Sequence, residues 1–255
     1  MILKRLGNKK KIASEIQKYF PPHKIYIEPF FGAGGMFFNK PKAKYNIVND
    51  LDSDVFNLFQ VVMNQKEELE KAFYMMPIHS DLFKYWKKNL EVEPIKKALR
   101  FLFLNNFTFM GAGDTLSYEN RPVKQRFFNV LDECFKFMSE CDLKLNNTDF
   151  NKFIKSIPSI KQDTEDCFIY CDPPYLGTRD NYSNSFTEEQ SIELFDTLQA
   201  TKCKFAMSEF DNEFILNQAK ERGLNVIIIG ERQNLKNRRT EILITNYEVN
   251  QTKLF

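Results

Sequence analysis

The residues from 25 to 50 limit the fold of this chain more than any other feature. Ile25-Tyr26-Ile27-Glu28 is typical of a buried strand, and the glycine-rich turn Gly32-Ala33-Gly34-Gly35 follows it. A second apolar run, 45–48, ends at Asn49-Asp50. A strand, a glycine-rich turn, a helix and a second strand that ends in an acid open a nucleotide-binding βαβ unit. This order predicts an α/β fold; the alternative is that the glycines only break a helix.

A second constraint comes from Asp172-Pro173-Pro174-Tyr175, which follows the apolar run Cys167-Phe168-Ile169-Tyr170-Cys171. Each proline lacks a backbone N–H, so the strand predicted over 167–171 ends here. Ligands of open α/β sheets bind at this carboxyl edge. There the segment offers a carboxylate and carbonyls that accept hydrogen bonds from an amino group, and a ring that stacks on a planar heterocycle. The alternative is a plain proline turn with Tyr175 half-buried.

The rest of the pattern alternates strands and helices, with one interruption. Helical periodicity or helix signals predict helices over 9–20, 51–64, 187–199 and 212–222, and Thr187-x-x-Gln190 is a capping box. Apolar runs predict strands over 204–207, 226–229 and 242–245, with a basic loop over 231–240. Region 55–130 is rich in helical patterns, and we expect the strand–helix alternation to resume at 167. We therefore expect 55–130 to be an inserted domain.

Composition narrows the class of protein further. The 255 residues, 43% of them hydrophobic, suffice for one large α/β domain with an insertion. The net charge of +2 says little about nucleic acid, whereas basic clusters near the N-terminus and over 232–239 suit either phosphates or solvent. Five cysteines without CxxC spacing and two distant histidines do not indicate a metal site. The chain has no apolar run of 18 residues, so we expect a cytosolic protein.

Taken in order, the motifs resemble the Dam-like, or D12, class of N6-adenine-specific DNA methyltransferases. The resemblance spans nearly the whole chain, and the segments that carry it are Lys4-Arg5-Leu6-Gly7-Asn8-Lys9, Ile27-Glu28-Pro29-Phe30-Phe31-Gly32-Ala33-Gly34, Val48-Asn49-Asp50-Leu51-Asp52-Ser53-Asp54, Phe101-Leu102-Phe103-Leu104-Asn105, Asp172-Pro173-Pro174-Tyr175, Asn184-Ser185-Phe186-Thr187 and Glu241-Ile242-Leu243-Ile244-Thr245-Asn246-Tyr247. Three residues depart from the class: Arg5 replaces a frequent Trp, Asn106 a usual Arg, and Glu209 a frequent Asn.

The resemblance implies a Rossmann-like, S-adenosylmethionine-dependent methyltransferase sheet with helices on both faces, plus an inserted, mostly helical target-recognition domain. Residues 1–54 and 131–255 would form the S-adenosylmethionine-binding catalytic domain, and 55–130 the insert. By motif matching, the expected catalytic residues are Asp172, Pro173, Pro174 and Tyr175. The expected cofactor contacts are Arg5, Lys9, Glu28, Phe31, Gly32, Gly34, Asp50 and Asp172. The side chains that we expect to contact DNA are Arg121, Lys124, Gln125 and Arg126.

The expected reaction is transfer of a methyl group to N6 of an adenine that is flipped out of double-stranded DNA. Asp172 and the Pro173 carbonyl would hold N6, and Tyr175 would stack on the base. Rival acceptors at the same motif are cytosine N4, an RNA base and a protein glutamine; a DNA-binding protein without catalysis is a further alternative. We expect a monomer without metal or membrane partner, in the cytoplasm of a bacterium or a phage-infected host.

Overall fold

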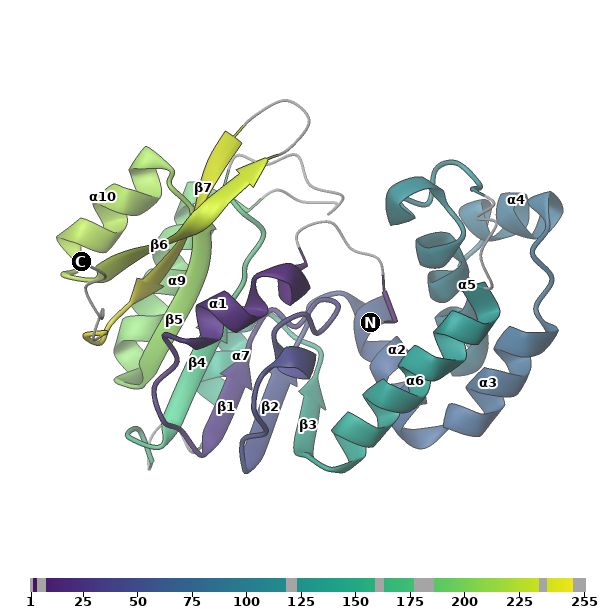
Figure 1. The fold of residues 1–255 in the computed structure, drawn as a ribbon, viewed down its shortest axis with the longest axis horizontal. Helices are drawn as coiled ribbons and strands as arrows, with labels where there is room; N and C mark the ends of the chain where they lie inside the picture. The colour runs from purple at the N-terminus through teal and green to yellow at the C-terminus, as the bar shows by residue number, and fades with distance from the viewer. Residues whose placement is uncertain are drawn as a thin grey trace.

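The computed structural model of the chain describes residues 2–3, 8–117, 123–158, 163–176, 186–233 and 238–249. Among these residues, seven strands form one sheet in the order β3-β2-β1-β4-β5-β7-β6 (Figure 1). The strands are β1 (Ile25–Glu28), β2 (Tyr45–Asn49), β3 (Asp142–Asn146), β4 (Cys167–Cys171), β5 (Lys204–Phe210), β6 (Asn225–Gln233) and β7 (Arg238–Thr245).

Strand β7 runs against the other strands of the sheet. Strands β1 to β5 pair in parallel, whereas β7 is antiparallel to both β5 and β6. The carboxyl ends of β1, β2, β4 and β5 therefore lie at the same edge as the beginning of β7. The register places Phe210, at the end of β5, opposite Glu241 of β7. This edge is where open α/β sheets bind ligands.

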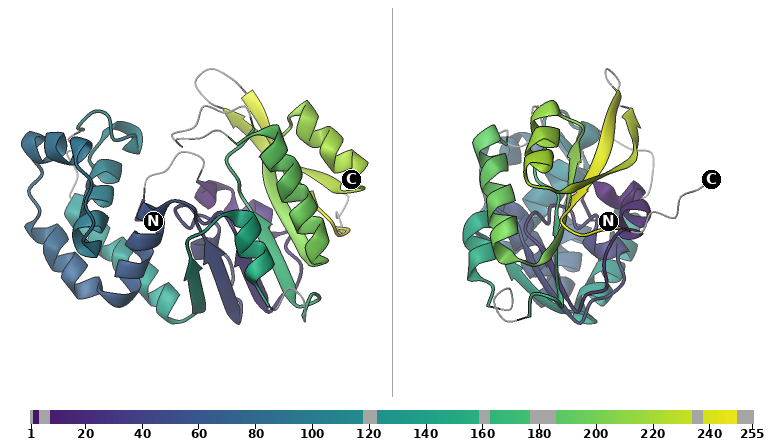
Figure 2. Two further views of the ribbon diagram at one scale, coloured as in Figure 1. Left: turned by 180° about the vertical axis from the view of Figure 1, so that it is seen from behind. Right: turned by 90° about the vertical axis from the view of Figure 1, so that its left-hand side faces the viewer.

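Both faces of the sheet are covered, because alternate residues of the central strands point to opposite sides. Tyr26 and Phe168 pack in one core with α1 (Ala13–Gln17). Ile27 and Ile169 pack in the other core with α7 (Phe150–Ser156), α9 (Glu188–Thr201) and α10 (Glu213–Glu221). Figure 2 shows the purple α1 on one side of the sheet and the green α9 and α10 on the other. The near-continuous apolar runs of β1 and β4 are explained by this burial on two faces.

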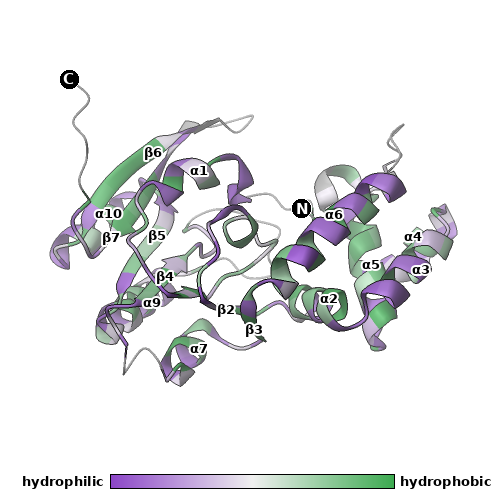
Figure 3. Cartoon of the chain, turned by 60° about the horizontal axis from the view of Figure 1, so that its bottom comes forward, coloured by the Kyte–Doolittle hydropathy of each residue, from purple (hydrophilic) through white to green (hydrophobic). Residues whose placement is uncertain are grey.

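A group of helices lies beyond β3, at the end of the sheet opposite to β6 (Figure 1). Its members are α2 (Ser53–Asn64), α3 (Lys66–Met75), α4 (Ser80–Lys88), α5 (Pro94–Asn106) and α6 (Val123–Ser139). Leu58 and Phe59 of α2 are buried in one core with Leu102 and Phe103 of α5. Hydrophobic residues are prominent on α2 and α5, and hydrophilic residues on α6 (Figure 3). No helix of the described residues is long and apolar enough to cross a membrane.

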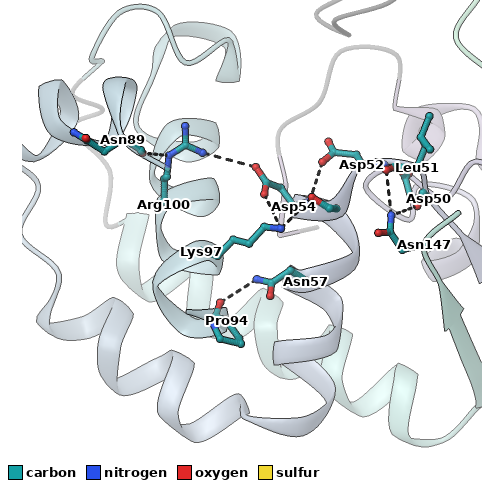
Figure 4. Close-up of polar contacts among 11 residues, drawn as sticks. Asp50, Leu51, Asp52, Asp54, Asn57, Asn89, Pro94, Lys97, Arg100 and Asn147 are labelled. Atoms are coloured by element: carbon teal, nitrogen blue, oxygen red, sulfur yellow. Dashed lines mark hydrogen bonds and ion pairs between the residues drawn. The ribbon is translucent and has the colours of Figure 1, made fainter. Parts of the chain in front are cut away.

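A polar network joins α2 to α5 and to the end of α4 (Figure 4). Lys97 Nζ lies 3.4 Å from Asp54 Oδ1, and Arg100 Nη1 lies 3.8 Å from Asp54 Oδ2. Arg100 Nε also donates a 2.8 Å hydrogen bond to the Asn89 carbonyl oxygen. Asp54 lies in the first turn of α2, shortly after Asp50. The network therefore fixes the helical group close to the carboxyl end of β2.

The structure confirms most of the predicted elements and corrects four of them. The helix expected between the glycine-rich turn and the second strand is only a 3-10 helix, η2 (Phe37–Asn39). Each predicted strand is present, and the capping box at Thr187 begins α9. The helix predicted over 9–20 is instead a short 3-10 helix, η1 (Lys9–Lys11), followed by α1. The basic loop predicted over 231–240 is wrong in part, because 231–233 and 238–240 extend β6 and β7. The strand–helix alternation resumes at β3, earlier than the predicted residue 167. The prediction missed β3 because polar residues alternate with apolar ones in this edge strand.

Candidate active site

The glycine-rich turn after β1 is tied to the end of β2 by an aspartate. The Gly32 N–H donates a 2.6 Å hydrogen bond to Asp50 Oδ2, and the Asp52 N–H donates one of 2.8 Å to Asp50 Oδ1. The Phe31 N–H donates to the Asn49 carbonyl oxygen at 2.9 Å. The predicted cofactor residues Phe31, Gly32 and Asp50 are thus brought together at the carboxyl edge of the sheet.

Two further glycines of this turn allow contacts that a side chain would prevent. Gly34 has a φ of +70°, and a Cβ there would lie 2.5 Å from the ring of Phe38. A Cβ on Gly35 would lie 2.4 Å from Asn8 Oδ1 and 3.0 Å from the Lys9 backbone nitrogen. The close packing of Gly35 against the N-terminal segment is what brings Lys9 to this edge.

The Lys9 ammonium lies between two carboxylates, Asp172 after the end of β4 and Glu241 on β7. Its Nζ is 2.6 Å from Asp172 Oδ1 and 3.3 Å from Glu241 Oε1, and the side chain is only 2% exposed. Nζ also lies 4.5 Å from the centroid of the Tyr175 ring. Both ends of the Asp172-Pro173-Pro174-Tyr175 segment therefore contact one lysine, and a contact of Lys9 with the cofactor stays a prediction.

Tyr175 is held on several sides by side chains. Its hydroxyl donates a hydrogen bond to Glu241 Oε1, and its ring meets that of Phe210 edge-on at 4.6 Å. Glu209 accepts hydrogen bonds from the Phe210 N–H at 2.9 Å and from the Leu176 N–H at 3.4 Å. Glu209, one of the departures from the class, thus joins the segment after Tyr175 to β5. Stacking of Tyr175 on a substrate base stays a prediction.

Burial favours the neutral form of several groups at this edge. It raises the pKa of the Glu28 carboxyl well above its ordinary value; the Tyr26 hydroxyl, which donates at 2.8 Å, opposes the shift, and the Asp172 charge adds to it. Burial also raises the pKa of Glu209 to about 8. The pKa of Tyr175 is raised well above its usual range, by burial first and then by Asp172 and Glu241. These shifts favour the neutral forms of Glu28 and Tyr175, which can act in hydrogen bonds.

The four residues predicted to contact DNA differ in their surroundings. Lys124 Nζ donates to the carbonyl oxygens of Tyr74 and Met76, at 2.6 and 2.8 Å, and so caps the carboxyl end of α3. Gln125 and Arg126 are exposed on the first turn of α6. Arg121 lies outside the described residues, as does the predicted cofactor contact Arg5.

Three features of the edge escaped the sequence analysis as parts of a site. Glu241 was noted only within the closing motif, yet it contacts both Lys9 and Tyr175. Leu51 is 72% exposed beside Asp50, and only the structure shows this exposure, because the sequence does not indicate whether a leucine is buried. Asn106, another departure from the class, donates to the Ile2 carbonyl oxygen at 3.1 Å and so holds the N-terminal segment against α5.

The sheet order and the groups gathered at its carboxyl edge define a Rossmann-like methyltransferase. Residues 6–235 match the family model of the D12 class N6 adenine-specific DNA methyltransferases, and the chain belongs to that family.

Curated relatives of similar length agree with this family. A DNA adenine methylase of Haemophilus influenzae is 30% identical over 251 residues, which cover 88% of this chain and 85% of the relative. A DNA adenine methylase of Escherichia coli K12 is 28% identical over 212 residues, covering 75% and 73%. Among solved structures, the rRNA methyltransferase aviRa of Streptomyces viridochromogenes superposes with a TM-score of 0.45 at 9% identity, covering 92% of this chain and 82% of that one.

Proposed function

We propose that this chain transfers the methyl group of S-adenosylmethionine to N6 of an adenine flipped out of double-stranded DNA. The observation that carries the proposal is the gathering of two groups of residues at one sheet edge. The first is the Gly32 turn with Asp50, and the second is Asp172 with Tyr175. Ligand binding at this edge is expected for the fold, and family membership favours adenine in DNA over cytosine, RNA or a protein glutamine.

The residues around the Gly32 turn fit S-adenosylmethionine. Apart from Gly32 and its two chain neighbours, no atom of the described residues lies within 4 Å of the position that a Cβ on Gly32 would take, so the turn leaves room for a ligand. Asp50 is partly exposed and offers acceptors for ribose hydroxyls, and the exposed Leu51 offers an apolar surface for a purine. Glu28, Phe31 and Gly34 would shape the pocket, with Arg5 and Lys9 from the N-terminal segment. The cofactor supplies an activated methyl group on a sulfonium centre.

The chemical difficulty is that adenine N6 is a poor nucleophile, because its lone pair is delocalised into the ring. The Asp172 carboxylate and the Pro173 carbonyl oxygen would each accept one amino hydrogen. Two such acceptors orient the amino group, favour a tetrahedral nitrogen, and stabilise the positive charge that grows on it. The two prolines hold both acceptors on a stiff backbone, which lowers the entropic cost of alignment. As the N–CH3 bond forms, the S–CH3 bond of the sulfonium breaks, and the N6 proton leaves after the transfer. Asp172 therefore acts as an acceptor and orienting group, and an obligate base is not required.

The target base cannot reach this edge while it is stacked in a duplex, so it would be flipped out and stack on Tyr175. We assign recognition of the DNA sequence to the helical region 55–130, with residues 1–54 and 131–255 as the catalytic domain. The exposed Gln125 and Arg126, together with Arg121, which lies outside the described residues, are the side chains proposed to contact DNA. Lys124 is proposed to support DNA binding indirectly, by holding the end of α3 in place through its bond to the Met76 carbonyl oxygen.

The test of this function is a product analysis. Unmethylated genomic DNA is incubated with the protein and with S-adenosylmethionine that carries an isotopically labelled methyl group. The DNA is then digested to nucleosides, which are weighed by mass spectrometry. We expect labelled N6-methyl-2′-deoxyadenosine from the parent and none from Asp172→Ala. Label in N4-methyl-2′-deoxycytidine, or parent-like activity of Asp172→Ala, would contradict the proposal.

Asp166→Ala is a matched control, because Asp166 precedes the opposite end of the same strand β4 and its side chain forms an exposed ion pair with Lys24, while its backbone hydrogen bonds are kept in the variant. An ion pair of this kind contributes about 0–1 kcal/mol, so the control should fold and methylate like the parent. Isothermal titration of the parent with S-adenosylmethionine tests the inactive alternative. A parent that binds DNA and fails to bind the cofactor would be a DNA-binding protein.

A further inference from the structure

Glu241 links both ends of the Asp172-Pro173-Pro174-Tyr175 segment. Its Oε1 accepts a hydrogen bond from the Tyr175 hydroxyl and lies 3.3 Å from Lys9 Nζ, and Lys9 Nζ lies 2.6 Å from Asp172 Oδ1. A closed ring of contacts therefore runs from Asp172 through Lys9 and Glu241 to Tyr175, and returns along the two prolines. These linked contacts set the distance between the Asp172 carboxylate and the aromatic side chain of Tyr175.

The burial of the charged side chains of Glu241 and Lys9 is costly, which indicates that they have a role beyond stabilising the fold. Glu241 is 1% exposed and Lys9 is 2% exposed. Removing two charges from water is costly, and an apolar pair of similar volume often stabilises a protein as well or better. Glu241 reaches this place only because β7 runs antiparallel, which puts its register position opposite Phe210 at the carboxyl end of β5. The charges lie at the one edge where the reaction is proposed to take place.

We infer that Glu241 is a positioning residue for methyl transfer, which fixes Tyr175 by its hydroxyl and draws Lys9 away from exclusive pairing with Asp172. The inference rests on the proposed roles of Asp172 and Tyr175. Asp172 has to accept a hydrogen from the amino group of the base while Lys9 is close to it. A lysine shared between two carboxylates withdraws less electron density from Asp172 than a lysine that pairs with Asp172 alone, so Asp172 stays the stronger acceptor.

The two parts of this role are separated by three substitutions. Glu241→Gln keeps an oxygen that accepts from the Tyr175 hydroxyl and removes the charge that attracts Lys9. Tyr175→Phe removes only the hydroxyl, and Glu241→Ala removes both contacts. If Glu241 holds Tyr175 in place, adding Tyr175→Phe to Glu241→Ala should cost little more than Glu241→Ala alone, because the contact is already absent.

The experiment measures single-turnover methylation of unmethylated genomic DNA with saturating labelled S-adenosylmethionine, together with cofactor affinity by titration and folding by circular dichroism. We expect Glu241→Gln to lower the rate constant about 10- to 100-fold, which is typical of a lost transition-state interaction, with a change in cofactor affinity of less than about threefold. Tyr175→Phe should lower the rate about 3- to 10-fold, and Glu241→Ala with Tyr175→Phe should stay within about threefold of Glu241→Ala.

Glu231→Gln is the matched control, because it removes the same charge from an exposed position on the neighbouring strand β6, opposite Thr240 of β7. It should methylate at the parent rate. A Glu241→Gln protein that folds and keeps the parent rate overturns the inference, as does an equal loss in Glu231→Gln. If Glu241→Gln fails to fold, Tyr175→Phe serves as the test. A parent-like rate for Tyr175→Phe would then overturn the inference that the Tyr175 hydroxyl contact with Glu241 supports methyl transfer. A parent that forms no N6-methyl-2′-deoxyadenosine overturns the proposed function. An active parent with a parent-like Glu241→Gln rate overturns only the role of Glu241.

Discussion

Gly32 and Asp50 connect the carboxyl ends of two neighbouring strands through one short hydrogen bond, 2.6 Å from the Gly32 nitrogen to Asp50 Oδ2. The other oxygen of the same carboxylate accepts from the Asp52 N–H at 2.8 Å. An acid expected from the sequence to bind ribose therefore also holds the turn that would bind the rest of the cofactor. Its two roles are coupled, because the turn loses its shape if the carboxylate is removed.

We expect Asp50→Ala to weaken S-adenosylmethionine binding at least about tenfold, which corresponds to about 1.4 kcal/mol. It should also lower the free energy of unfolding by about 1–3 kcal/mol, because partly buried N–H groups lose their acceptor. Isothermal titration and chemical denaturation measure the two effects. Asp149→Ala is the control: Asp149 caps the N-terminus of α7 in the same chemical manner, so it should lower stability by about 1 kcal/mol and leave cofactor affinity unchanged. Parent-like affinity in Asp50→Ala would show that this carboxylate does not support the cofactor.

Gly34→Ala tests the shape of the turn directly. The φ of +70° disfavours any side chain by about 1 kcal/mol, and the new Cβ would also meet the Phe38 ring at 2.5 Å. Gly223→Ala has a similar φ of +66° and no described atom within 4 Å of its Cβ. We expect both variants to be destabilised, and only Gly34→Ala to lose cofactor affinity, by about tenfold or more. Equal affinities in titrations of the two variants would mean that the turn is not part of the cofactor site.

Much of this edge could be predicted because the information lies in consecutive residues. Ile25–Glu28 and Cys167–Cys171 are buried on both faces, as expected for central strands of a parallel sheet, and the residues that follow them are necessarily at one edge. The position of Asp50 follows from the same reasoning. The fold class and half of the candidate site therefore depend only on local pattern.

The remaining contacts depend on strand direction and on packing between distant segments. An apolar run over 242–245 predicts a strand and carries no sign of its direction, so the approach of Glu241 to Tyr175 was not foreseen. Strand β3 was missed because Asp142 and Lys144 alternate with leucines on a half-exposed edge strand. Lys124 was predicted to face DNA, and its bonds to two helix-end carbonyls arise only when α3 packs against α6.

Glu209 should make the stability of the protein dependent on pH. Burial raises its folded-state pKa from an ordinary value of 4.5 to about 8, so the folded protein binds this proton more tightly than the unfolded chain does. Its contribution to stability is fully present below about pH 4.5 and is lost as the pH rises towards and through 8. Glu209→Gln resembles the protonated acid and does not titrate.

Thermal unfolding of the parent and of Glu209→Gln between pH 5 and pH 9 measures this effect. Relative to the parent, the variant should gain roughly 2–4 kcal/mol of stability across that range, since each pKa unit corresponds to about 1.4 kcal/mol. Glu213→Gln, on an acid exposed in the first turn of α10, is the control and should follow the parent profile. Parallel pH profiles for the parent and Glu209→Gln would contradict the raised pKa.

Arg126 and Lys124 should behave differently although both are basic residues at the beginning of α6. Arg126 is exposed, whereas Lys124 donates to the Tyr74 and Met76 carbonyl oxygens. If Arg126 contacts a phosphate, Arg126→Ala should weaken DNA binding severalfold and lower the slope of log affinity against log salt by about 1. Lys124→Ala should instead lower the free energy of unfolding by about 1 kcal/mol, through the lost bonds to the end of α3.

The DNA measurement is fluorescence anisotropy with an unmethylated duplex between 50 and 200 mM salt, a range over which phosphate contacts change affinity strongly. Lys152→Ala, on an exposed lysine of α7, removes the same charge on the other face of the sheet and controls for net charge. It should leave both the affinity and the slope near the parent values. A slope for Arg126→Ala equal to that for Lys152→Ala would remove Arg126 from the DNA interface and direct the search to other exposed residues of the helical region 55–130.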